Sequence, residues 1–515
     1  MPSVDDPSSV PAPAPTVAAT ARRGAARVVA RNTASLLAAQ VLMKILGFGF
    51  SVFVVRSLGQ DDFGRYAATM ASVALFGAFT DLGTSALSVR EMARRRSICA
   101  SMVPDLTALR VLLSVSVIIV LTTATAWLGK PAEMVWGMFV GSCVLLLYAF
   151  QGPLDSLLIA EERLDFSAAF SLLNQIVFIG LGTVLLLAGA GYLGLLIASL
   201  VGVLAMTVAC RRAVGRILGQ RFERPNLRRA VSLLRASAPF GVMALAGMFS
   251  RRFDTVFMAL VLTDAAVGWY NVPYNLIAGM LLLAQALGLS IFPALIREYD
   301  SGRGSLRTTV QPTLRHLLLV SLPIALGGTL LADRIIMVLY GSRFAPAIPL
   351  LQIMLWALPP MFLAEILGRT AAAMHLERVE ARLTVGIAAL SVVLMLLCIP
   401  TLGTIGAALV MVVTWFLIVI VSSFIIGPAL LWKDNTGPVL RTLAANALMG
   451  VVVWAVRHTA FVQRCNDKPA LIVLVGTGAV AYASAVMVFG AVSRSEARYL
   501  WAGLQGGMRW LERGR

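Results

Sequence analysis

Three charged residues interrupt an apolar stretch near the middle of the chain. The segment Ser250–Asp254 contains Arg251, Arg252 and Asp254 and lies inside the otherwise apolar run 233–262. A helix of that length, at about 1.5 Å per residue, crosses a hydrocarbon core of about 30 Å and places both arginines near mid-depth. Since a central arginine costs about 2.5–3.5 kcal/mol on insertion scales, we expect the pair to face a watered cavity lined by protein.

Two interpretations of these arginines stay open. Arg251 and Asp254 are three residues apart and share a helix face, so they can form an ion pair that only holds helices together. Alternatively, the guanidinium groups, with Arg252 pointing about 100° away from Arg251, line a path for an anionic substrate. The second interpretation makes both arginines candidate substrate-binding residues.

Two further charged residues lie inside the first apolar stretches. Lys44 is at mid-depth in its stretch, where it reaches the interface only with difficulty. Asp81 precedes Leu82-Gly83, and its structural interpretation is either an ion pair with Lys44 or a cap at a helix break near Gly83. Its functional interpretation is coupling of transport to an ion gradient.

The second half of the chain offers four more polar candidates. Asn271 and Asn275 share a helix face and can bond either to sugar hydroxyls or to a neighbouring helix. Glu365 and Arg369 are four residues apart, in the order that favours an ion pair within one helix. For Asn271, Asn275 and Arg369, substrate contact and structural bonding both remain open, and for Glu365 the alternatives are an ion pair and coupling to an ion gradient.

These residues must be positioned by membrane helices. Of the 515 residues, 59% are hydrophobic and only 13% are charged, which is typical of a polytopic membrane protein. Fourteen apolar stretches are long enough to span a bilayer. They are 33–56, 64–89, 104–128, 134–160, 166–189, 191–210, 233–262, 266–296, 313–332, 346–374, 379–400, 402–431, 438–460 and 469–492.

The net charge of +18 follows the expected topology instead of indicating a nucleic-acid-binding face. With the amino terminus inside, the inner segments carry 30 of the 43 Lys and Arg residues and the outer loops carry 8. This asymmetry predicts that both termini are cytoplasmic and that the protein spans the cytoplasmic membrane many times.

The five cysteines include no C-x-x-C pair, and there are only three histidines. We therefore expect no metal, no disulfide framework and no other cofactor. Residues 1–31 are rich in Pro, Ala and Ser without an apolar core, which predicts a disordered basic cytoplasmic tail and no signal peptide. Residues 493–515 have an apolar side and separate arginines, as in an interfacial amphipathic helix.

An internal repeat divides the membrane region. Two of its matches have an offset of 204 residues and the third has an offset of 207. The matches are Leu58 and Phe63-Gly64-Arg65-Tyr66 with Leu262 and Val267-Gly268-Trp269-Tyr270, Arg31 with Arg235, and Val89-Arg90-Glu91 with Ile296-Arg297-Glu298. Because six helices separate the copies, both copies cross the membrane in the same direction.

The repeat predicts an all-α polytopic membrane protein with two six-helix lobes related by a parallel pseudo-two-fold axis, followed by two more helices. We expect an amino-terminal lobe at 32–215, an arginine-rich cytoplasmic connector at 216–232, and a carboxy-terminal lobe at 233–431. The last two helices occupy 432–492. Repeats of this kind place their substrate site between the halves, near the bilayer midplane.

At this point the chain resembles the polysaccharide-transporter branch of the superfamily of multidrug, oligosaccharidyl-lipid and polysaccharide exporters. This branch includes the O-antigen flippases. The resemblance covers about residues 32–492. It rests on Asn32 through Gln40, Arg56-Ser57-Leu58-Gly59, Phe63-Gly64-Arg65-Tyr66, Asp81-Leu82-Gly83 with Arg90-Glu91, and Asp254 followed by Gly268-Trp269-Tyr270.

The resemblance implies a fourteen-helix flippase, and not an enzyme. Such a protein moves a polyprenyl-diphosphate-linked oligosaccharide outward by alternating access, for surface polysaccharide synthesis. Cations of the cavity meet the diphosphate in this family, a role that falls here on Arg251 and Arg252 and on Lys44. The chain departs from that pattern by mixing acids with bases, which leaves coupling to a proton or sodium gradient open. Partners would be the lipid-linked glycan, membrane lipids, and glycosyltransferases or a polymerase of the same pathway.

Two other functions compete with this interpretation. A cation-coupled multidrug antiporter of the same superfamily would favour acidic and aromatic cavity groups, whereas the mid-depth charges here are slightly more basic than acidic. A membrane glycosyltransferase or polymerase would need a large extramembrane loop or a nucleotide-binding motif, and neither is present in the sequence.

Overall fold

The computed structural model describes residues 15–217, 222–432, 435–464 and 466–490, and every regular element in them is a helix. The chain separates into two units, residues 1–51 and 52–515. The α-helices are α1 (Pro15–Asp81), α2 (Thr84–Arg94), α3 (Cys99–Trp127), α4 (Ala132–Ser142), α5 (Val144–Ala160), α6 (Leu164–Leu187), α7 (Gly191–Ile217), α8 (Leu227–Val261), α9 (Asp264–Asp300), α10 (Arg303–Leu339), α11 (Ala347–Met354), α12 (Leu358–Ala373), α13 (Glu377–Ile426), α14 (Pro428–Trp432), α15 (Thr436–Arg457), α16 (Ala460–Arg464) and α17 (Asp467–Val488).

Two of these helices are too long for a single membrane crossing, and a glycine breaks each of them. Gly59 (φ 75°) interrupts the 67 residues of α1, and Gly403 (φ 60°) interrupts the 50 residues of α13. Glycine accepts this left-handed backbone without a side-chain clash. Gly59 lies between the predicted stretches 33–56 and 64–89, and Gly403 lies at the start of the predicted stretch 402–431.

Within the described residues, every predicted membrane stretch lies mainly on helices. Eleven helices in the described part of the chain are long and apolar enough to cross a membrane, and a bent pair at α1 and α2 adds one more. The predicted span 134–160 is divided between α4 and α5. The span 346–374 contains α11, a short 3₁₀ turn (Leu355–Ala357) and α12. The all-α polytopic fold is therefore confirmed.

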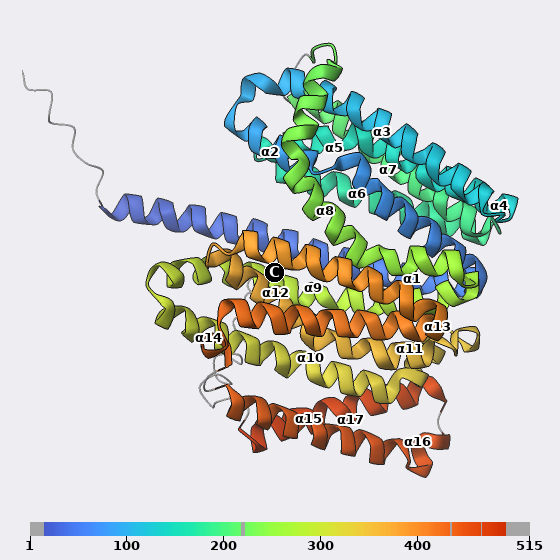
Figure 1. Cartoon of the computed structure of the whole chain (residues 1–515). Helices are drawn as coiled ribbons and strands as arrows, with labels where there is room; N and C mark the ends of the chain where they lie inside the picture. The colour runs from blue at the N-terminus through green and yellow to red at the C-terminus, as the bar shows by residue number, and fades with distance from the viewer. Residues whose placement is uncertain (1–14, 218–221, 433–434, 465, 491–515) are drawn as a thin grey trace, which may run out of the picture. The chain divides into compact units, whose positions relative to one another are not determined.

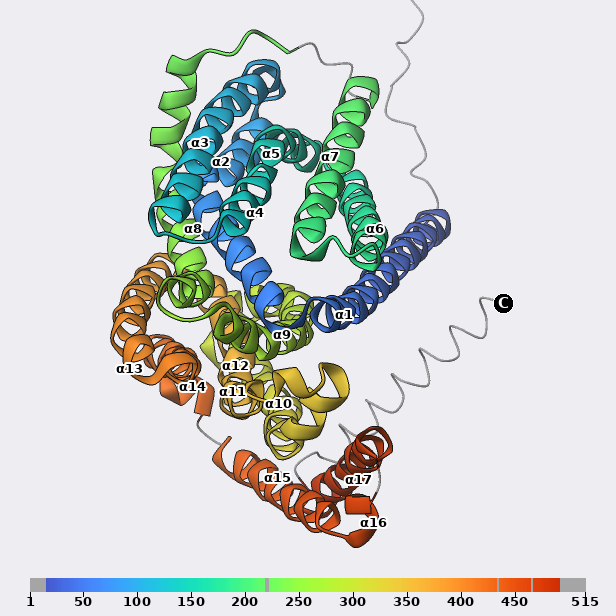
Figure 2. The ribbon, with the colours of Figure 1, turned by 90° about the vertical axis from the view of Figure 1, so that its right-hand side faces the viewer.

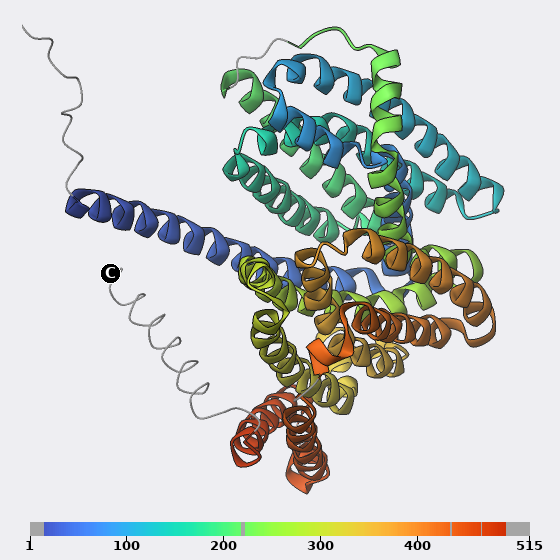
Figure 3. The ribbon, with the colours of Figure 1, turned by 60° about the vertical axis from the view of Figure 1, so that its left-hand side comes forward.

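Within residues 52–515 the helices gather into two bundles. α6 packs on α7, and α5 packs on α3 and α7. In the second bundle α12 packs on α9, α10 and α13. Figures 1 and 2 show α2–α7 in one bundle and α9–α13 in another. The pair α15 and α17, red in Figure 3, is packed on α10 through buried Leu331, Met449, Val453 and Leu474.

Helix α8 contacts both bundles, because it packs on α2 and α3 and also on α9 and α13. Near its start, the hydroxyl of Ser237 donates to the Leu82 carbonyl at 3.0 Å. Gly83 and Gly241 meet backbone to backbone, and a Cβ added to Gly83 would lie 2.4 Å from the Gly241 nitrogen. The absence of side chains at these two positions allows α8 to approach the α1–α2 break this closely.

The structure shifts two predicted boundaries. Residues 15–31, expected to be disordered, are helical, which agrees with the high helix propensity of their many alanines. Helix α8 begins at Leu227 instead of 233, because the Asn226 side chain accepts from the Arg228 and Arg229 nitrogens and caps it. The predicted tails 1–14 and 493–515 lie outside the described residues.

Candidate functional site

The Arg251–Asp254 segment lies in the second half of α8, ten residues before the helix ends at Val261. The Arg251 side chain is exposed, Arg252 is half-buried, and Asp254 is only 3% exposed. The three charged side chains therefore occupy different environments within one turn of helix.

Asp254 is held by hydrogen bonds from neutral groups. The Tyr270 hydroxyl of α9 donates to its carboxylate at 2.5 Å, and the Thr255 backbone nitrogen donates at 2.6 Å. In the described residues Asp254 makes no ion pair with Arg251, so this structure does not have the arrangement of the first of the two open interpretations. The reason is that the short Asp254 side chain points into the α8–α9 contact, where the tyrosine lies.

The two arginines have different neighbours. Arg251 Nε donates to the Gly247 carbonyl of its own helix at 3.2 Å. The Arg252 guanidinium carbon lies 5.7 Å from the ring centroid of Tyr274, a cation–π contact. Within the part of the chain that the structure describes, neither guanidinium makes an ion pair with a carboxylate.

Other arginines of the apolar helices are paired with acids. Arg369 and Glu365 of α12 form an ion pair at 2.7 Å, the contact that the structural alternative for these two residues describes. The Arg369 guanidinium also lies 5.9 Å from the Phe292 ring centroid on α9. A Cβ at Gly288 would lie 2.5 Å from Arg369 Nε, so glycine leaves the room that this side chain occupies.

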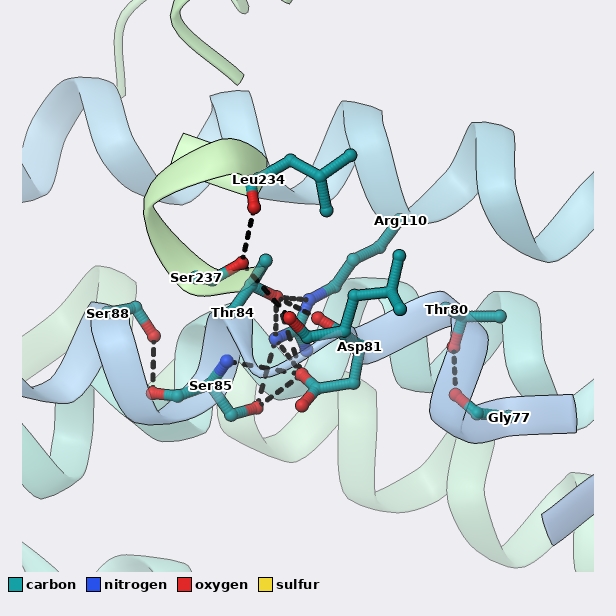
Figure 4. A network of polar contacts seen from close by, with 10 residues as sticks. Gly77, Thr80, Asp81, Thr84, Ser85, Ser88, Arg110, Leu234 and Ser237 are labelled. Atoms are coloured by element: carbon teal, nitrogen blue, oxygen red, sulfur yellow. Dashed lines mark hydrogen bonds and ion pairs between the residues drawn. The ribbon is translucent and has the colours of Figure 1, made fainter. Parts of the chain in front are cut away.

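Asp81 pairs with an arginine that the sequence analysis did not select. Arg110 of α3 is 5% exposed, forms an ion pair with Asp81, and donates to Thr84 Oγ1 from Nε at 3.1 Å (Figure 4). Asp81 also accepts from the backbone nitrogen of Ser85 at 3.2 Å, at the start of α2.

Asp81 therefore caps a helix break, as one of its structural alternatives predicted, with Leu82 at φ 43° and Gly83 at φ 76°. The other structural alternative for Asp81 was an ion pair with Lys44, but in this structure its partner is Arg110. The Lys44 side chain itself lies outside the described residues. An arginine six residues inside the apolar stretch 104–128 was the signal that would have identified Arg110.

The two asparagines of α9 differ in exposure. Asn271 is 2% exposed, its amide donates to the Val267 carbonyl at 2.9 Å, and the Thr255 hydroxyl of α8 donates to its oxygen at 3.5 Å. This is the interhelical alternative, so Asn271 is not exposed to a substrate in this structure. Asn275, one turn further along the helix, is exposed.

The two copies of the internal repeat meet where α1 and α9 cross. A Cβ added to Gly64 would lie 1.7 Å from the Asp264 carbonyl oxygen, and a Cβ added to Gly268 would lie 2.3 Å from the Gln60 carbonyl oxygen. Gln60 and Asp264 are equivalent at the repeat offset of 204, as are Gly64 and Gly268. The helices therefore touch through equivalent backbone positions.

Two equivalent side-chain hydrogen bonds join the same crossing. Arg65 Nε donates to Asp264 Oδ2 at 2.9 Å, and Trp269 Nε1 donates to Gln60 Oε1 at 3.1 Å. Arg65 and Trp269 are again related by 204 residues. This pattern is what a pseudo-two-fold axis passing between Gly64 and Gly268 would produce. We call residues 60–65 and 264–269 the α1–α9 crossing.

Comparison with protein families identifies the relatives of this chain. The family model described as "Polysaccharide biosynthesis protein" matches residues 29–299, slightly more than half of the chain. The chain belongs to this family. The match includes the α1–α9 crossing, Asp81, Arg110 and the Arg251–Asp254 segment, while Glu365 and Arg369 lie beyond it.

One curated protein is similar to this chain in sequence. A protein of Haloferax volcanii named "Probable low-salt glycan biosynthesis flippase Agl15" is 25% identical over 255 residues, which are 49% of this chain and 53% of that protein. The chain thus matches about half the length of this relative.

Solved structures share the fold at low identity. The structure titled "Lipid II flippase MurJ, inward closed conformation" aligns with a TM-score of 0.72 and 14% identity, over 88% of this chain and 98% of that one. An inward-facing multidrug resistance MATE family transporter aligns with a TM-score of 0.52 and 16% identity, over 76% and 96% of the two chains. At these identities the likeness concerns the fold alone.

Proposed function

We propose that this protein is a flippase, and not an enzyme, which moves a polyprenyl-diphosphate-linked oligosaccharide across the cytoplasmic membrane by alternating access. The observation that carries the proposal is the pair Arg251 and Arg252, two guanidinium groups within a membrane-length helix, neither of which forms an ion pair with a carboxylate in the described residues. The family membership and the name of the Haloferax volcanii relative support the same function.

The chemistry of a diphosphate matches these arginines. A diphosphate carries about two negative charges, and a guanidinium offers a planar fork of donors that fits phosphate oxygens and keeps its charge when partly desolvated. Exposed Asn275 lies on the neighbouring α9 and can bond to a sugar hydroxyl. Lys44 is a further candidate for the diphosphate.

Alternating access requires that two lobes separate on one side of the membrane at a time. We propose that the lobes are residues 32–215 and 233–431, and that the α1–α9 crossing closes the outer side. The charge asymmetry supports this orientation, with both termini cytoplasmic. Glycosyltransferases or a polymerase of the same pathway would supply or consume the lipid-linked glycan.

Coupling to a proton or sodium gradient would use the membrane acids. Asp81 and Glu365 are each paired with an arginine, and each side chain is partly accessible, at 33% and 20%. A carboxylate that exchanges its arginine for a proton or sodium ion during transport could link the lobe movement to the gradient.

The test is surface glycan per molecule of membrane-inserted protein in cells that depend on this chain. We expect Arg251→Ala and Arg252→Ala to insert normally and to lower export about 10- to 150-fold, the equivalent of losing a charged hydrogen bond of about 1.5–3 kcal/mol. Lysine at either position should restore part of the export, because it keeps the charge without the planar fork.

Arg228→Ala is the matched control, because Arg228 is an exposed arginine at the start of the same helix. Its export should equal that of the wild-type protein. Wild-type export per molecule in both Arg251→Ala and Arg252→Ala would remove these arginines from the mechanism. Active export of cationic drugs with unchanged surface glycan would favour the multidrug antiporter instead.

A further inference from the structure

Two tyrosines of α9 contact the arginine segment of α8. Tyr270 and Tyr274 are one turn apart, and their rings stack with centroids 6.1 Å apart and an interplanar angle of 27°. The Tyr270 hydroxyl donates to Asp254, and the Tyr274 hydroxyl donates to the Arg251 carbonyl at 2.9 Å. The segment 251–254 is thus held by one residue of α9 at each end.

The two tyrosines differ in what they can influence. Tyr270 is fully buried and its hydroxyl donates to Asp254, so this contact is internal to the α8–α9 packing. Tyr274 is half-buried, and its ring lies beside the Arg252 guanidinium at 5.7 Å. Tyr274 therefore contacts both arginines. It bonds to the backbone carbonyl of Arg251, and its ring lies against the charged group of Arg252.

A free arginine side chain samples many rotamers and loses that freedom when it binds a ligand. An aromatic face beside the guanidinium reduces this loss, because the group is already oriented before the ligand arrives. The hydroxyl bond to the Arg251 carbonyl joins α9 to the backbone of α8 beside this contact. The ring contact therefore orients the Arg252 guanidinium, whereas the direction of the Arg251 side chain does not depend on Tyr274.

We propose that Tyr274 is a positioning residue that orients the Arg252 guanidinium for an anionic lipid headgroup. The proposal rests on the proposed function, since it concerns the same two arginines. The free energy of a cation–π contact sets the size of the expected effect. Removal of the ring should therefore weaken binding of the anion about 2- to 30-fold. The maximal transport rate should change little, because the ring acts on binding and not on the movement of the lobes.

The experiment measures binding of farnesyl diphosphate, a short polyprenyl diphosphate, to the full-length protein in lipid nanodiscs. Tyr274→Leu and Tyr274→Met should both weaken binding about 2- to 30-fold, whereas Tyr274→Phe keeps the ring and should remain within about twofold of wild type. Tyr148→Leu, at an exposed tyrosine of α5, is the matched control and should bind as wild type. Thermal melting of each variant shows whether it is folded, and two apolar replacements keep the test informative if one of them does not fold.

A double-mutant cycle with Arg252→Ala separates positioning from general packing. In the Arg252→Ala background, Tyr274→Leu should cause no further loss of affinity, because the group that it orients is gone. If the two losses multiply, or if Tyr274→Leu alone binds normally while Arg252→Ala does not, the positioning role is refuted and the arginine site stands. Wild-type affinity in both Arg251→Ala and Arg252→Ala would instead refute the proposed function.

Transport by the same variants gives a second readout. With Tyr274→Leu the substrate concentration for half-maximal transport should rise by the same factor as the dissociation constant, and the maximal rate should be retained. A lower maximal rate with unchanged affinity would assign Tyr274 to the structure of the helix pair and overturn the proposal.

Discussion

Replacement of Gly64 by alanine tests whether the α1–α9 crossing closes one side of the protein. The new Cβ would lie 1.7 Å from the Asp264 carbonyl oxygen, whereas ordinary contact begins at 3.4 Å, so the helices must separate by about 1.7 Å at this point. The obstacle is backbone and cannot rotate away. Overpacking of this kind costs about 1–3 kcal/mol, which shifts an equilibrium between closed and open forms about 5- to 160-fold.

We therefore expect Gly64→Ala to increase the fraction of molecules that are open at this crossing. Gly268→Ala should act in the same direction but less strongly, because its Cβ would lie 2.3 Å from the Gln60 carbonyl and needs a smaller separation. This order of the two effects follows from the geometry alone and does not depend on which substrate is transported.

The assay is a distance measurement between spin labels at Trp127, at the end of α3, and Met337, near the end of α10, both exposed. The labels are introduced in a variant whose five cysteines are replaced. The longer-distance population should grow in Gly64→Ala. Gly386→Ala on α13, where a Cβ would meet nothing within 4 Å, should leave the distances unchanged. If Gly64→Ala has the wild-type distances between the labels and the wild-type stability, the close contact between Gly64 and the Asp264 carbonyl is refuted.

Three further predictions concern the charged residues and the topology. Arg110→Ala should lower folded protein in the membrane, because its loss leaves the partly exposed Asp81 carboxylate without a charged hydrogen bond of about 1.5–3 kcal/mol, and thermal melting of the purified variant measures the loss. The Asp81→Asn, Glu365→Gln double variant should lose part of its dependence on the proton or sodium gradient in proteoliposome transport, and full retention of that dependence would exclude both acids from coupling. Cysteine labelling should reach Cys465 from outside and the range 434–441 from inside, so labelling of Cys465 only from the cytoplasm would contradict the proposed topology.

The sequence alone determined the helical fold and the features that depend on spacing within one helix. The apolar stretches predicted the helices because a backbone in lipid must satisfy its hydrogen bonds within one segment. The Glu365–Arg369 pair was predictable, since residues four apart on a helix are neighbours whatever surrounds them. The cap of Asp81 at the break near Gly83 was predictable for the same local reason.

Only the tertiary structure decided which residues of different helices meet. Asp81 takes Arg110 from α3 as its partner, and Asp254 takes Tyr270 from α9 in place of nearby Arg251. The repeat revealed that Gly64 and Gly268 are equivalent, but not that they touch. Partner choice between helices depends on which faces pack together and on where missing side chains permit close approach, and neither is encoded by spacing along a single helix.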